Sequence, residues 1–82
     1  MATKHDLPDW VKDSLRDLGG QASLLAVAKQ IWKNHESDLK ASGDLFFTWQ
    51  YDVRWAANSL RRRGIMKPAE VSPVGIWELA KI

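Results

Sequence analysis

Hydrophobic side chains recur at the spacing of a helix near the start of the chain, over residues 7–18. The positions that would share one face of this helix are Leu7, Trp10, Val11, Leu15 and Leu18. Asp6 precedes the stretch as a candidate cap, and Gly19-Gly20 follows it with the residue type that closes helices. The pattern therefore predicts a first helix between these points, after a disordered tail at residues 1–5.

A second helical pattern begins after a short link at residues 21–22, which has room for a single extended pairing. Ser23 is a candidate cap, and the helix is predicted to run to about residue 34. Its predicted buried face is Leu24, Leu25, Ala28, Ile31 and Trp32. Residues 35–44 are polar and contain Ser42-Gly43, which predicts a long loop with space for one more helical turn at residues 37–40.

The longest predicted element is a helix over residues 45–63, which ends before Gly64. Its apolar positions fall within an arc of about 100°, typical of a core-facing stripe. They are Phe46, Trp49, Val53, Ala56, Ala57 and Leu60. Beyond this helix, residues 65–67 and 75–82 are predicted to form the two strands of a hairpin, joined by a proline-bounded loop at residues 68–74. Alternation in the second strand predicts Trp77 and Leu79 on one face, with Ile76 and Glu78 on the other.

The predicted order of elements is three helices followed by a two-stranded β-hairpin. This order is that of an α+β, mainly helical fold, the winged helix-turn-helix, in a single domain over residues 6–82. The chain has 82 residues and no cysteine, so no disulfide holds it together and it must rely on packing. Its five tryptophans are the first candidates for the core, because aromatic side chains bury the largest areas.

Several classes of function are not expected from this composition. The lack of cysteine excludes thiol chemistry and cysteine-ligated metals, and it is typical of a cytoplasmic protein. The longest apolar run, at residues 24–28, is far below the roughly 18 residues of a membrane span, and acidic residues occupy the place of a signal peptide. His5 and His35 are far apart and belong to no ligand pair. We therefore expect no enzyme, no catalytic residue, no cofactor, no metal site and no membrane contact.

The positive charge of the chain is concentrated in one segment. Residues 45–67 carry five cationic side chains against Asp52 alone, a net charge of +4. The helix dipole accounts for one or two cations near the end of a helix, but less easily for the run at residues 61–63. With Arg54 and Asn58 these arginines predict a basic, hydrogen-bonding helix face, suited to phosphates and to base edges. The predicted DNA-binding residues are Tyr51, Arg54, Asn58, Arg61, Arg62, Arg63 and Lys67.

An aromatic stripe on the same helix complicates this interpretation. Phe47, Tyr51 and Trp55 follow each other at intervals of four residues on the outward side. The favoured explanation is that the hairpin or the loop before the helix covers part of the stripe, with Ile76 or Trp77 against Trp55. The alternative is that the stripe is a surface for a homodimer or another protein partner, because exposed apolar patches mark interfaces.

Three stretches of the chain resemble a known family. They are residues 18–22 (LGGQA), residues 53–60 (VRWAANSL) with 63–65 (RGI), and residues 75–79 (GIWEL). Together they are similar to the winged-helix domain at the N-terminus of Mrr-type restriction proteins, from about Trp10 onward. The resemblance implies a DNA-binding winged helix whose recognition element is the helix around Arg54 to Arg63. Val74 stands where members of the family tend to have a basic residue, and no nuclease domain follows in this chain, so cleavage is not expected of it.

We therefore expect a double-stranded DNA-binding protein, most simply a small transcriptional regulator that reads DNA with its third helix. The competing interpretation is a protein interaction module of the same fold that docks through the aromatic stripe, because fold alone does not determine function.

Overall fold

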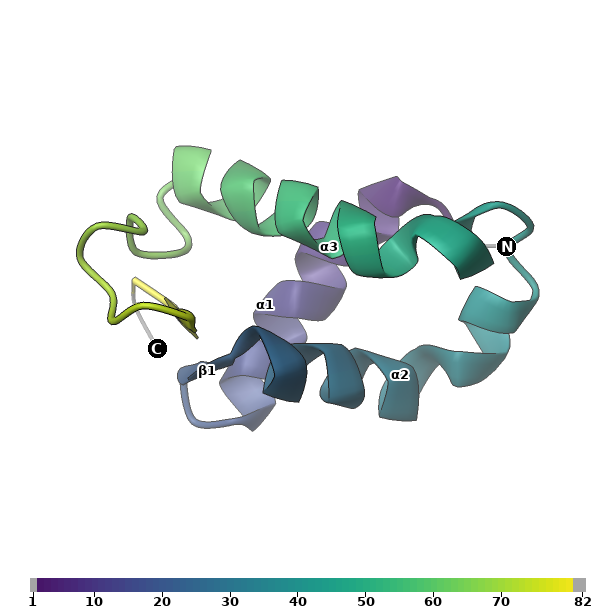
Figure 1. Cartoon of the computed structure of the whole chain (residues 1–82), viewed down its shortest axis with the longest axis horizontal. Helices are drawn as coiled ribbons and strands as arrows, with labels where there is room; N and C mark the ends of the chain where they lie inside the picture. Colours follow the sequence, from purple (N-terminus) through teal and green to yellow (C-terminus); the bar gives the residue numbers. More distant parts are fainter. Residues whose placement is uncertain (1, 81–82) are drawn as a thin grey trace.

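Helices make up most of the molecule. The computed structural model describes residues 2–80, and within them it contains three α-helices, α1 (Leu7–Asp17), α2 (Leu24–Lys40) and α3 (Leu45–Arg62). A short 3-10 helix, η1 (Lys4–Asp6), precedes them, and two short strands, β1 (Gln21–Ser23) and β2 (Ile76–Glu78), form a sheet. Figure 1 shows α2 and α3 running side by side in opposite directions, with α1 crossing behind them. The fold is thus α+β and mainly helical, as predicted.

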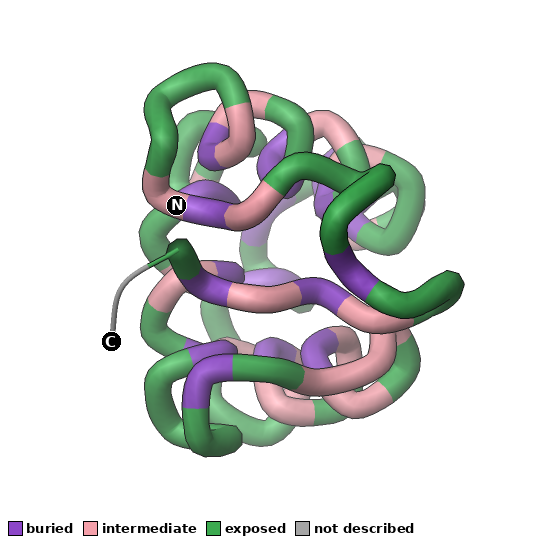
Figure 2. The backbone as a smooth tube through the Cα atoms, turned by 90° about the vertical axis from the view of Figure 1, so that its left-hand side faces the viewer, coloured by how far each residue is buried: buried purple, intermediate pink, exposed green. Residues whose placement is uncertain are grey.

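The core lies where α1 packs against α2 and α3. Each helix contributes apolar side chains at helical spacing, among them Leu7, Val11 and Leu15 of α1 and Leu60 of α3, all with no exposed surface. Figure 2 shows buried positions recurring along the helices and strands, with exposed positions between them and along most of the loops. The core side chains of α3 were predicted almost completely, and of its predicted stripe only Phe46 stays partly exposed.

The buried face of α2 differs from the prediction. Val27 and Ile31 are fully buried, whereas Leu25 is 63% exposed. At about 100° per residue, Leu25 lies about 160° around the helix from Val27 and so points away from the core. Leu24 lies about 60° from Val27 and is half-buried. Leu18, expected on the inner face of the first helix, is likewise exposed, because it lies beyond the last turn of α1.

Helix α2 is also longer than predicted and includes most of the expected loop. It continues to Lys40 through a kink at His35, whose backbone leaves the helical region at φ −131°. Leu39 is fully buried beyond the kink, and the His35 ring stacks on Trp10 at 3.8 Å between ring centroids. Burial of Leu39 explains why the last turns dock on the core although their sequence is largely polar.

The sheet joins distant parts of the chain. Strand β1 pairs antiparallel with β2 in the register Gln21 to Glu78, Ala22 to Trp77 and Ser23 to Ile76. The expected hairpin between residues 65–67 and 75–82 is present but short, with an antiparallel bridge between Met66 and Leu79. Backbone hydrogen bonds from the Lys67 amide to the Glu78 carbonyl at 2.9 Å and from the Ala80 amide to the Ile65 carbonyl at 2.8 Å flank this bridge, and residues 81–82 lie outside the described range. The link at residues 21–22 thus belongs to β1, which forms the longer pairing with β2. Trp77 and Leu79 are both buried, as the alternation predicted.

Residues 2–6 pack on the domain, and residues 4–6 form η1, whereas the sequence predicts a disordered tail at residues 1–5. The Thr3 hydroxyl accepts a hydrogen bond from the His5 amide, and the Asp6 carboxylate accepts one from the Thr3 amide at 2.9 Å. Thr3 is therefore the N-cap of η1, and Asp6 completes its capping box. Asp6 also occupies the predicted N-cap position of α1, but its side chain makes no capping hydrogen bond there. The Ala2 amide donates to the Ser42 hydroxyl at 3.1 Å, so this segment is tied to the turn before α3. Within residues 2–80 no helix has the combination of length and apolar character that a bilayer crossing requires.

Candidate functional site

Helix α3 has one buried face and one open face. Trp49, Val53 and Leu60 belong to the buried face, together with the two alanines at residues 56–57. The side chains at residues 47, 51, 54, 58 and 62 are all exposed. Because a helix turns by about 100° per residue, these positions form a single stripe opposite the core. We call these five residues the open face of α3: Phe47, Tyr51, Arg54, Asn58 and Arg62.

Arginines near the open face have no internal counter-charge. Arg54, Arg62 and Arg63 are exposed and form no salt bridge with any residue of the described range 2–80. By contrast, Lys12 and Arg16 of α1 each lie within 4.0 Å of a carboxylate on their own helix. The positive charge at the C-terminal half of α3 is therefore open to an external anion.

Two of the predicted DNA-binding cations are held by the protein itself. Arg61 donates through Nε to the Lys67 carbonyl at 3.3 Å, and its guanidinium lies 6.0 Å from the Trp77 ring. The Lys67 ammonium lies 3.2 Å from a carboxylate oxygen of Glu78. These contacts connect the end of α3 to β2. The charges of Arg61 and Lys67 are therefore less available to an external anion than the charge of Arg54.

Asn58 lies between the arginines on the open face. Its side-chain oxygen accepts a hydrogen bond from Arg61 at 3.4 Å. This contact orients the amide so that its NH₂ group remains free to donate, and the oxygen keeps a second lone pair. The arrangement leaves Asn58 able to offer both a donor and an acceptor to one partner.

The aromatic stripe is only partly covered, and not by the expected segment. Phe47 is 81% exposed and Tyr51 is 78% exposed, so neither the hairpin region nor the turn before α3 shields them. Trp55 is half-buried because η1 packs on it, with the Lys4 ammonium 4.9 Å from its ring and the His5 ring edge-on at 5.7 Å. The expected contact between Trp55 and β2 is replaced by this contact with the N-terminal segment.

The loop at residues 68–74 offers no positive charge of its own. Glu70, Val71 and Val74 are all exposed on it. An anionic partner would therefore meet the end of α3 rather than this loop.

One neighbour of the open face was missed from the sequence. Gln50 is exposed four residues before Arg54 and carries an amide like that of Asn58. Helical spacing from Arg54 is the signal that could have found it.

These features define a small α+β domain whose longest helix presents a basic, hydrogen-bonding face. Comparison with models of known protein families, with curated proteins and with solved structures finds no match for this chain.

Proposed function

We propose that this chain is a winged helix-turn-helix protein that binds double-stranded DNA through the open face of α3. The order α1, β1, α2, α3 and β2, with the bridge between Met66 and Leu79, supports the winged-helix assignment. In this arrangement α1 crosses behind α3, and the short sheet lies beside the start of α2, on the side of the molecule where α3 ends (Figure 1). The resemblance of residues 18–22, 53–60 and 75–79 to Mrr-type winged-helix domains also supports this assignment.

The chemistry of the open face suits the major groove of DNA. That groove is about 12 Å wide and admits an α-helix. Arg54 and Arg62 would reach phosphates or guanine edges, and Asn58 presents the donor and acceptor that an adenine edge requires. Tyr51 adds a hydroxyl and an aromatic ring one turn before Arg54.

Residues at the end of the helix would contact the DNA backbone. Arg63 follows the last turn of α3 and is exposed, so it would approach a phosphate. Arg61 and Lys67 contribute less, because each already binds a group of the protein. The single observation that carries the proposal is the set of exposed arginines without an internal counter-charge, at residues 54, 62 and 63.

The simplest biological role for such a protein is a small transcriptional regulator. A domain of this size reads few base pairs, and a homodimer on two half-sites would extend the contact.

The salt dependence of DNA binding tests the proposal. A labelled mixed-sequence duplex, titrated with the protein and followed by fluorescence anisotropy, should bind at low salt and dissociate as salt rises. If about four phosphates are neutralised, log K should fall against log salt with a slope of about −3.6. Absence of binding at low salt, or binding that does not respond to salt, would contradict the proposal.

The exposure of Phe47 and Tyr51 favours a second candidate function, protein docking through the aromatic stripe. A docking module predicts no duplex binding at any salt concentration, so the same titration separates the two functions.

A further inference from the structure

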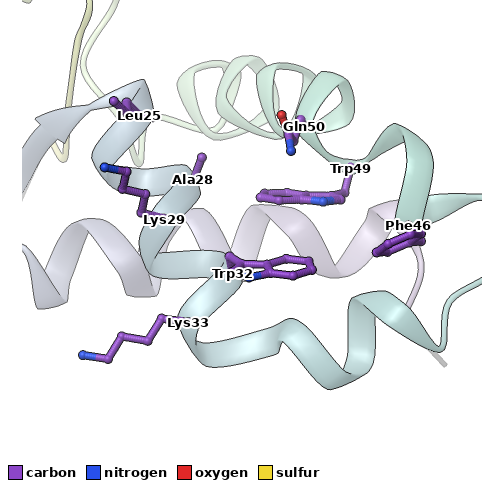
Figure 3. A pocket seen from close by; sticks show the side chains of 8 residues that line it. All are labelled: Leu25, Ala28, Lys29, Trp32, Lys33, Phe46, Trp49 and Gln50. Atoms are coloured by element: carbon purple, nitrogen blue, oxygen red, sulfur yellow. The ribbon is translucent and has the colours of Figure 1, made fainter.

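A groove between α2 and α3 lies beside the open face and contains none of the proposed DNA-contacting residues. Its volume is about 490 Å³. We call it the α2/α3 groove, and its lining residues are Leu25, Ala28, Lys29, Trp32, Lys33, Phe46, Trp49 and Gln50. Figure 3 shows that they come from both helices and that the rings of Trp32 and Trp49 lie next to one another between α2 and α3.

The floor of the groove is aromatic. The rings of Trp32 and Trp49 lie nearly parallel, 6.1 Å apart between centroids and at 12° to one another. Phe46 lies 6.4 Å from Trp32 between ring centroids and closes the end of the groove next to the start of α3. Leu25, at the other end, is 63% exposed and extends the apolar lining of the groove to the surface.

The rim of the groove is positively charged. Lys29 and Lys33 are its charged lining residues, and no acidic side chain of the described chain lines it. Both lysines are exposed and form no salt bridge within residues 2–80. They lie four residues apart on one helix, a spacing at which like charges repel each other and lower helix stability. An external anion beside them would remove that repulsion.

One class of partner matches both the aromatic floor and the positively charged rim of the groove. We infer that the α2/α3 groove binds an acidic amphipathic helix of a partner protein, with its apolar side on Trp32, Phe46 and Leu25 and its carboxylates beside Lys29 and Lys33. Two neighbouring antiparallel helices leave a furrow into which the apolar face of another helix can pack. A DNA duplex presents phosphates on its outside and no continuous apolar ridge, so it fits the rim but not the floor.

The test uses a synthetic peptide of about 18 residues, long enough to form a helix, with leucines along one face and glutamates along the other. Labelled with a fluorophore, it is titrated with the whole protein and followed by anisotropy. Two peptides serve as controls, one with lysine in place of every glutamate and one with the same composition in scrambled order. We expect the acidic amphipathic peptide to bind at least about tenfold more tightly than either control.

Matched variants of the protein locate the binding site. Leu25→Glu should weaken peptide binding at least about tenfold, because it places a carboxylate at the mouth of the groove beside the peptide's own. Val71→Glu adds the same charge at a side chain with the same exposed fraction of 63%, but in the loop at residues 68–74, and should leave binding nearly unchanged. Lys29→Glu should weaken binding of the acidic peptide and strengthen binding of the control peptide that carries lysine in place of every glutamate.

Four results would overturn the inference. They are no binding of the acidic peptide, equal binding of the scrambled peptide, equal effects of the two glutamate substitutions, and sedimentation showing a dimer that Leu25→Glu dissociates.

The duplex titration is run on the same variants. If Leu25→Glu weakens DNA binding more than Val71→Glu does, and the duplex displaces the peptide, the groove belongs to the DNA site and the inference fails. Peptide binding without duplex binding would instead contradict the proposed function alone.

Discussion

Replacing Arg54 with alanine is expected to weaken binding of a mixed-sequence DNA duplex by roughly 5- to 150-fold, equivalent to about 1–3 kcal/mol. Arg54 lies in the middle of the open face, is exposed, and has no ion-pair partner within residues 2–80. Its guanidinium is therefore free to bind a phosphate or a guanine edge, and alanine removes that contact without disturbing the core. The dissociation constants of the two proteins, measured by anisotropy at one salt concentration, give the effect.

Arg16→Ala is the matched control for this substitution. Arg16 is an exposed arginine on α1 whose guanidinium lies 3.8 Å from the Asp13 carboxylate. It carries the same charge but is not part of the open face of α3. Its loss should change duplex affinity by less than about twofold, because an exposed charge that makes no direct contact acts only through a field that salt screens. Equal losses for the two variants would mean that DNA responds only to net charge, and the assignment of α3 as the contact surface would be wrong.

Leu60→Ala is expected to destabilise the fold by about 2–5 kcal/mol. Leu60 is fully buried on the inner face of α3 and accepts hydrogen bonds at its carbonyl from the Ile65 and Met66 amides that close the helix. Truncation leaves a cavity where α3 meets the rest of the core. For a domain of this size each kcal/mol lowers Tm by roughly 4–8 °C, so thermal unfolding followed by circular dichroism would show a large decrease.

Leu25→Ala provides the comparison within the same protein. Leu25 is 63% exposed, and its truncation should change stability by no more than about 0.5 kcal/mol. A loss as large as that of Leu60→Ala would show that Leu25 is packed, which would contradict both the described fold and the accessibility of the α2/α3 groove.

The helices were the most predictable part of the fold. Apolar spacing and the glycines that follow located α1 and α3 to within about a residue, because both signals are local. Gly64, at φ +76°, is an example, since this backbone conformation favours glycine and ends α3 where the sequence predicts. The Ser23 hydroxyl accepts a hydrogen bond from the Ala26 amide at 3.1 Å, which confirms the predicted cap of α2.

Long-range contacts could not be predicted from local patterns. Strand β1 pairs with β2, which lies more than 50 positions later in the sequence, and no pattern within residues 21–23 indicates which segment they pair with. The last turns of α2 look like a loop in the sequence because one leucine, Leu39, supplies their anchor. Residues 2–5 contact Trp55 and Ser42, and the sequence of these residues alone does not reveal such contacts.

The candidate site was predicted in part. Helical spacing places Tyr51, Arg54 and Asn58 on one face, and this placement follows directly from the turn of a helix. The different surroundings of Arg61 and Lys67 depend on how the end of α3 meets β2, and only the folded structure reveals them. The α2/α3 groove likewise requires the relative placement of two helices.

The most direct test of DNA binding through α3 is a map of the amide chemical shifts of isotope-labelled protein as a short mixed-sequence duplex is added. Binding through α3 predicts that the largest shifts cluster on the exposed residues of this helix, around Tyr51, Arg54, Asn58 and Arg62, and that they reverse when salt is raised. Shifts that cluster instead around Leu25 and Lys29, or no shifts at low salt, would contradict it.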